Sequence, residues 1–148
     1  MIETEGPTAQ LCAAGMAVDG DATAAHALFV QAWEARRDAY DASIAAHFLA
    51  RHQPSAELVL HWNHVAVEQA LAVDPARARP LLASLYLNLG DSYLKLDRLN
   101  EAAGAAASGT DALTYLPAGG YRDFVSVGLE RLRSRIAAAP SNSASDER

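Results

Sequence analysis

The sequence predicts an all-α protein made of antiparallel helical hairpins. Apolar residues recur at steps of three and four and almost nowhere at steps of two, which is the spacing of one helix face. Alanine, a strong helix former, is abundant, and runs of β-branched residues are absent. Short clusters of Gly, Pro, Asp and Ser separate the helical patterns. Because these connections are short, neighbouring helices are expected to run antiparallel.

The breaks divide the chain into about seven helical segments. Their expected bounds are 8–18, 21–37, 41–53, 56–73, 80–96, 99–116 and 121–138. Asp41 and Ser55 are expected N-caps, because their side chains can accept hydrogen bonds from the first turn of a helix. Asp74 and Pro75 are expected to end the fourth segment. Pro80 is expected to open the fifth, since proline is tolerated in a first turn.

Composition indicates one domain over residues 1–139 and a disordered tail over residues 140–148. The chain has 148 residues, of which 51% are hydrophobic and 20% charged. A domain of this size buries roughly 70% of the surface of its unfolded chain. The segment after Pro140 contains no apolar residue larger than alanine, so it has nothing to add to a core.

Charge and cysteine content exclude several classes of protein. The net charge of −6 argues against a nucleic-acid groove, which needs clustered Lys and Arg. No apolar run reaches the ~18 residues that a membrane helix needs. The acidic start differs from a secretory signal, and the single cysteine, Cys12, excludes an internal disulfide. We therefore expect a cytoplasmic protein that binds neither membrane nor nucleic acid, with Cys12 as a small buried residue.

One stretch carries a recognisable motif. Tyr86, Leu89, Gly90 and Tyr93 follow at steps of three, one and three, and Ala102 comes after a turn. The stretch resembles a tetratricopeptide repeat, whose first helix reads W-x2-L-G-x2-Y and whose second helix carries A-x3-F. A glycine that faces an alanine lets two helices approach closely, which can offset its helix-propensity cost of ~1 kcal/mol.

Weaker fragments of the same pattern occur elsewhere. They are Ala25, Phe29 and Ala32; Ala70 and Pro75; Ala112 and Pro117; and Phe124, Val127 and Gly128. The closing segments lie about 42 residues apart, whereas the family repeats every 34. Ala106 also takes the place of the family's phenylalanine, and residues 41–53 match no family position. The resemblance implies a short right-handed solenoid of divergent hairpins with a closing C-terminal helix.

By analogy with the family, the first helices line a concave groove that binds a protein or peptide partner. The expected groove residues are Ser84, Leu87, Asp91, Leu94, Lys95, Arg122, Val125, Leu129 and Arg133. The mixture of apolar and charged side chains suits an extended peptide or a helix of a partner. A second copy of the chain in this groove, giving a homodimer, is an alternative. No cofactor motif, nucleophile motif or acid/base pair emerges, so an enzyme is not expected.

Polar residues around the turn near Pro54 suggest a rival site. His47, Arg51, His52 and Asn63 could form a pocket for a ligand carboxylate or a peptide end. The alternative is a structural network in which Arg51 caps carbonyls at the helix end. A polar group left unbonded in such a place would cost ~1–3 kcal/mol.

The same region contains histidines at metal-ligand spacing. His47, His52, His61 and His64 flank one turn, and the last two are three residues apart. The competing interpretation is a surface stripe of Glu57, His61, His64 and Glu68 at steps of four, three and four. Glu–His pairs four apart are ordinary partners on a helix surface, so no metal is expected.

Overall fold

The computed structural model describes residues 6–140, and it contains no strand within that range, which confirms the predicted all-α class. The α-helices are α1 (Pro7–Ala17), α2 (Ala22–Glu34), α3 (Ala39–Leu49), α4 (Ala56–Leu71), α5 (Pro75–Lys95), α6 (Leu99–Ala112) and α7 (Gly120–Ala138). Two 3-10 helices, η1 (Ala50–His52) and η2 (Leu113–Tyr115), follow α3 and α6. The predicted tail lies outside the described residues from 141 onward. Across residues 6–140, no helix combines the length and apolar character needed to cross a lipid bilayer.

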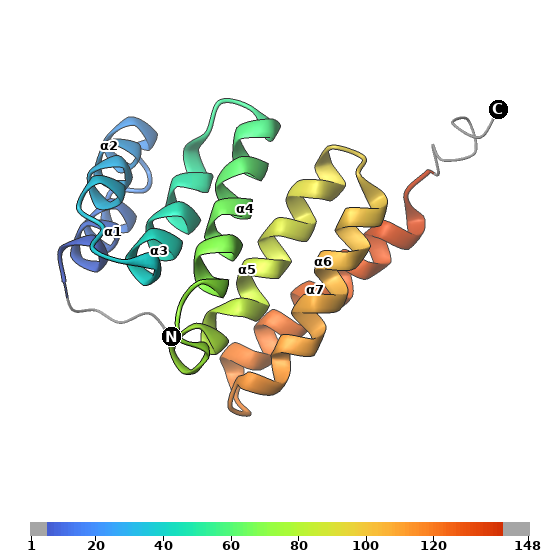
Figure 1. The fold of residues 1–148 in the computed structure, drawn as a ribbon. Helices are drawn as coiled ribbons and strands as arrows, with labels where there is room; N and C mark the ends of the chain where they lie inside the picture. The colour runs from blue at the N-terminus through green and yellow to red at the C-terminus, as the bar shows by residue number, and fades with distance from the viewer. Residues whose placement is uncertain (1–5, 141–148) are drawn as a thin grey trace.

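The helices pack side by side in chain order (Figure 1). Consecutive helices contact each other throughout, and each odd-numbered helix also contacts the next odd-numbered helix. Within residues 6–140, α2 does not contact α4, and α4 does not contact α6. The last helix, α7, contacts both α5 and α6. Successive odd-numbered helices therefore adjoin, whereas the even-numbered helices α2, α4 and α6, all within the described range, do not adjoin one another.

Side-chain caps fix the start of four helices. The capping residues are Asp21, Asp38, Ser55 and Asp74. Ser55 is the cap that the sequence predicted. The prediction for Asp41 is wrong, because Asp41 lies in the first turn of α3 and donates its backbone N–H to Oδ1 of Asp38 at 2.8 Å. Its own carboxylate accepts the backbone N–H of Arg37 at 3.0 Å. Both aspartates precede helix-forming residues, so the sequence pattern did not separate them.

The sequence predicted that helix α5 begins at Pro80, but the helix begins at Pro75. Asp74 caps the helix by accepting the backbone N–H of Ala76 at 3.1 Å. Pro75 occupies the first turn, where proline is favourable. Pro80 lies inside the helix, where it removes the hydrogen bond that a backbone N–H would make to the carbonyl of Ala76 and crowds that carbonyl. The cap at Asp74 therefore decides between two prolines that both suit a helix start.

Buried glycines let α5, α6 and α7 approach closely. A Cβ atom on Gly90 would lie 2.6 Å from Cδ2 of Leu132 and 3.4 Å from the carbonyl oxygen of Ala102. The predicted close approach of Gly90 to Ala102 is confirmed, and the contact with Leu132 of α7 is new. A Cβ atom on Gly109 would similarly lie 2.8 Å from Cδ2 of Leu129. Two leucines of α7 thus pack over glycines of α5 and α6, which fixes α7 beside α5.

Candidate functional site

Two adjoining hollows lie along one side of α5. One of ≈ 680 Å³ lies between α5 and α7, and one of ≈ 280 Å³ lies between α3, η1, α4 and α5. They share Asn88 and Asp91, and together we call them the α5 groove. The lining residues are His47, Ala50, Arg51, Val59, Asn63, Leu87, Asn88, Asp91, Ser92, Lys95, Val127, Gly128, Glu130, Arg131, Ser134 and Arg135.

Asp91 lies where the two hollows meet and is bound by two cations. Nζ of Lys95 is 2.9 Å from Oδ2 of Asp91, and Nη2 of Arg135 donates to Oδ1 at 2.9 Å. Burial disfavours the charged carboxylate, but the hydrogen bonds from Lys95 and Arg135 outweigh it and lower the pKa of Asp91. Asp91 is therefore ionised at neutral pH and joins α5 to α7.

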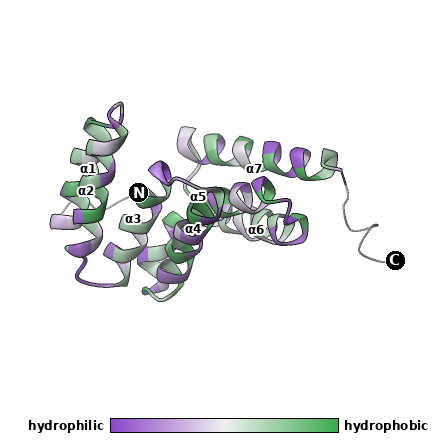
Figure 2. Cartoon of the chain, turned by 90° about the horizontal axis from the view of Figure 1, so that it is seen from above, coloured by the Kyte–Doolittle hydropathy of each residue, from purple (hydrophilic) through white to green (hydrophobic). Residues whose placement is uncertain are grey.

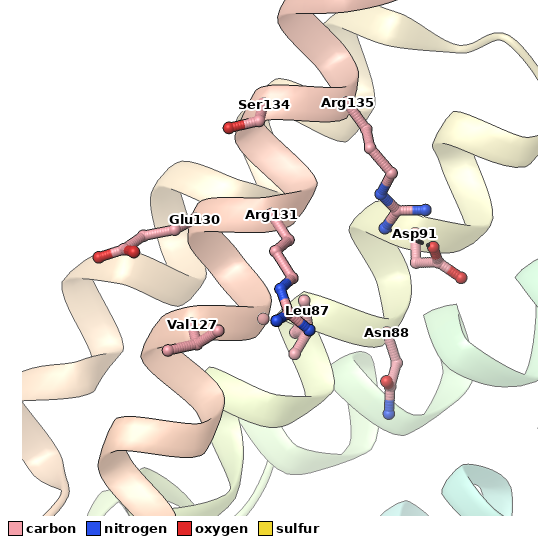
Figure 3. Close-up of a pocket in the computed structure, with 9 residues that line it drawn as sticks. Leu87, Asn88, Asp91, Val127, Glu130, Arg131, Ser134 and Arg135 are labelled. Atoms are coloured by element: carbon pink, nitrogen blue, oxygen red, sulfur yellow. Dashed lines mark hydrogen bonds and ion pairs between the residues drawn. The ribbon is translucent and has the colours of Figure 1, made fainter.

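Arg131 is the second arginine that α7 extends toward α5 (Figure 3). It lies one turn before Arg135, and its guanidinium reaches toward Leu87. Within residues 6–140, no hydrogen bond or ion pair joins the Arg131 side chain to another residue. Glu130 projects from the opposite side of α7, away from Asp91 (Figure 3). The charge of Arg131 is therefore not compensated inside the groove.

Apolar side chains adjoin these arginines. Cδ2 of Leu87 would lie 2.7 Å from a Cβ atom on Gly128, so α5 and α7 touch at this point. Val127 is 44% exposed and Phe124 is 75% exposed, which is high for large apolar residues. Figure 2 shows hydrophobic and hydrophilic residues interspersed along α7. The exposed surface of this helix thus combines positive charge with apolar area.

The smaller hollow has a floor of polar side chains that bond to one another. Asn63 donates from Nδ2 to Oγ of Ser92 at 2.6 Å, and Ser92 donates to the carbonyl oxygen of Asn88 at 2.9 Å. Nδ2 of Asn88 lies 3.4 Å from Nδ1 of His47. Because Nδ2 is a donor only, Nδ1 of His47 is the acceptor. Burial, with the charge of Arg51 as a smaller cause, lowers the pKa of His47 to about 4. His47 is therefore neutral at pH 7.

Arg51 and His52 bind Asp19 in the connection between α1 and α2. Nε of Arg51 donates to Oδ1 of Asp19 at 3.1 Å, and Nε2 of His52 lies 2.7 Å from the same oxygen. Hydrogen bonds from Arg51 and then His52 lower the pKa of Asp19 to about 2. The His52 ring stacks with Phe29 at a centroid distance of 6.3 Å. His52 does not line the groove, so its place in the predicted pocket is corrected, whereas Arg51 does line it. The bonding partner of Arg51 is Asp19, and not the helix-end carbonyls that the alternative interpretation named.

The predicted groove residues fall into three groups. Leu87, Asp91 and Lys95 line the α5 groove. Val125 and Leu129 are each only 1% exposed, so their prediction as groove residues is corrected. They belong to the face of α7 that packs into the core. The lining of the groove does not include Ser84, Leu94, Arg122 or Arg133.

Several groove residues were missed from the sequence. Asn88, Arg131 and Arg135 line the groove but were not predicted there. A signal was present, because Asn88, Asp91 and Lys95 follow at helical steps of three and four. The two arginines are likewise one turn apart. These polar stripes look like ordinary solvated faces until the neighbouring helix is known.

The other candidate residues do not gather into a site. His64 pairs with Glu68 through an Nδ1–Oε1 distance of 2.9 Å, as the surface-stripe interpretation predicts. In residues 6–140, no three His, Cys, Asp or Glu side chains lie close enough together to hold a metal ion. Burial, with the Asp41 charge as a smaller cause, raises the pKa of the Cys12 thiol to about 12. Cys12 is therefore a protonated core residue at neutral pH.

Comparison of the chain with models of protein families, with curated proteins and with solved structures gives no match.

Proposed function

We propose that this chain is a non-catalytic protein-interaction module whose α5 groove binds an extended peptide segment of a partner protein. The observation that carries the proposal is the continuity of the groove across side chains from α3, α4, α5 and α7. Extended peptides are recognised in elongated depressions where side chains supply specificity. A groove that crosses several helices meets that requirement better than a single closed pocket does.

The proposal includes a tetratricopeptide-like arrangement, in which the pairs α1–α2, α3–α4 and α5–α6 stack as a short right-handed solenoid closed by α7. Contacts between successive odd-numbered helices support it. The close approach of Gly90 to Ala102 supports it as well. In a stack of this kind the first helices of the hairpins line an extended binding surface. The α5 groove lies on α3 and α5, which are first helices in this arrangement, on the closing helix α7, and also on Val59 and Asn63 of α4.

The side-chain chemistry of the groove favours binding over proton transfer. A general acid or base works best when its pKa lies near the operating pH. Asp91 has a lowered pKa and His47 has a pKa of about 4, so neither is poised near neutrality. Asn63 and Ser92 bond to each other, which also makes a small-molecule site at the polar hollow the weaker alternative. A cytoplasmic location remains part of the proposal on composition alone.

Partner capture from a native lysate tests the proposal with Asn88→Trp, because Asn88 adjoins both hollows. A bulky uncharged side chain at this position should fill the groove without changing its charge. We expect proteins retained by the wild-type chain to be lost from the variant. The matched control is Asn100→Trp on the exposed surface of α6, which should retain them.

Mass spectrometry identifies the captured proteins, and circular dichroism verifies that both variants fold. Equal capture by Asn88→Trp and the wild-type chain would contradict the proposal. Capture of only further copies of this chain, lost in the same variant, would make the groove a homodimer interface.

A further inference from the structure

Asp91 is the carboxylate of the α5 groove that two cationic side chains contact. Lys95 and Arg135 each contact its carboxylate at 2.9 Å, and its side chain is still 30% exposed. Arg131 lies one turn before Arg135 and has no partner within residues 6–140. The remaining charged groups do not cancel this excess, because Arg51 is bound by Asp19 and Glu130 points away from α5.

We infer that Asp91 is an internal competitor for an acidic side chain of the partner. The groove accepts an acidic peptide segment, and a carboxylate of that segment binds between Arg131 and Arg135, where it replaces Asp91. This inference rests on the proposed peptide-binding function and names the chemistry of the partner.

The charges favour an acidic ligand over a basic one. A basic segment would approach Lys95, Arg131 and Arg135. Of the two carboxylates among the groove's described lining residues, Asp91 is already bound on both oxygens and Glu130 projects away from α5. An acidic segment finds Arg131 uncompensated and can exchange with Asp91 at Arg135. Planar guanidinium groups suit carboxylates because they donate parallel hydrogen bonds.

The apolar surroundings favour a peptide over a nucleic-acid backbone. Leu87 and Val127 line the same hollow as the two arginines and offer contact area to an apolar side chain of the ligand. The chain as a whole carries a net charge of −6, which repels a long polyanion. A short acidic segment with an adjacent apolar residue satisfies both observations.

Removal of the Asp91 charge is expected to improve peptide binding, although Asp91 itself lines the groove. Asp91→Asn keeps the size of the side chain and removes the competing charge, so it should strengthen binding. The exposed ion pairs involved limit the gain to roughly fivefold in Kd. Arg131→Gln should weaken binding by a similar factor. In an Arg135→Gln background, Asp91→Asn should lose most of its effect, because the two residues act as a pair.

A phage-displayed library of random peptides provides the ligand for this test. The library is selected on the wild-type chain and counter-selected on Asn88→Trp. We expect the enriched peptides to be rich in Asp and Glu. The most enriched one is synthesised, and its Kd is measured with Asp91→Asn and Arg131→Gln. The matched controls, Asp111→Asn and Arg133→Gln, lie outside the groove and should leave the Kd unchanged.

The outcomes separate this inference from the proposed function. Enriched peptides that are basic or uncharged, or weaker binding by Asp91→Asn, would overturn the competitor role and leave a peptide-binding groove. Failure to find any peptide that distinguishes the wild-type chain from Asn88→Trp would overturn both. A labelled single-stranded oligonucleotide that binds more tightly than the peptide at equal salt would assign the groove to nucleic acid instead.

Discussion

Gly90 and Asp91 are neighbours in the sequence that serve two different surfaces. A helix turns by about 100° per residue, so consecutive side chains leave on different faces. Gly90 faces the carbonyl of Ala102 and the side chain of Leu132, whereas Asp91 faces the groove. The packing that holds α5 to its neighbours and the charge that we assign to partner selection are thus one residue apart.

Gly90→Ala should destabilise the protein by about 1–3 kcal/mol, because the added methyl group would overlap Leu132. Gly104→Ala is the matched control in α6, since a Cβ atom there meets nothing within 4 Å. That control should be neutral or stabilising by up to about 1 kcal/mol, since alanine is the better helix former. Urea denaturation measures both. A gain in stability from Gly90→Ala would refute the packing argument.

Helix α7 illustrates which parts of the molecule the sequence could predict. Its existence and its length followed from local signals, namely the glycine pair at its start and the apolar repeat within it. The face that it buries depends on α5 and α6, which are distant in sequence. Val125 and Leu129 were for this reason placed in the groove, although they lie in the core. Arg131 and Arg135 line the groove, although neither was predicted there.

The attachment of α7 gives an element-scale prediction. Leu132 is fully buried and packs over Gly90 of α5. Leu132→Ala should reduce the free energy of unfolding by roughly 2–5 kcal/mol, the usual range for a buried leucine. Leu71→Ala is the control, because that side chain is 60% exposed and its loss should cost well under 1 kcal/mol. Equal effects in chemical denaturation would show that α7 is not held by this contact.

Across the whole molecule, polar contacts join the helix pairs at specific points. Thr8 donates to the carbonyl of Ala32 between α1 and α2, and Ser43 donates to the carbonyl of Ala66 between α3 and α4. Asn63 links α4 to α5 through Ser92. The sequence indicated that Asn63 needed a hydrogen-bond partner, but the partner is distant in sequence and only the fold identifies it. Satisfied buried bonds of this kind favour one arrangement over others.

The pH dependence of global stability follows from His47 in this network. Its pKa is lowered from the ordinary value of 6.5 to about 4, chiefly by burial. Between those values the unfolded chain binds a proton that the folded chain does not. The contribution of neutral His47 to the free energy of unfolding is therefore fully present well above pH 6.5 and is lost as the pH falls toward 4. We expect the free energy of unfolding to drop by about 1–2 kcal/mol from pH 7 to pH 5, measured by denaturation at each pH.

The chosen pH range separates His47 from the carboxylates. Asp19 and Asp91 have pKa values below the ordinary value of 3.8, so the stability that they contribute is lost only at lower pH. His47→Gln keeps an acceptor for the Asn88 amide but cannot titrate, and it should flatten the profile between pH 7 and pH 5. If His47→Gln retains the wild-type slope between pH 7 and pH 5, then His47 is not the half-buried neutral group that joins α3 to α5.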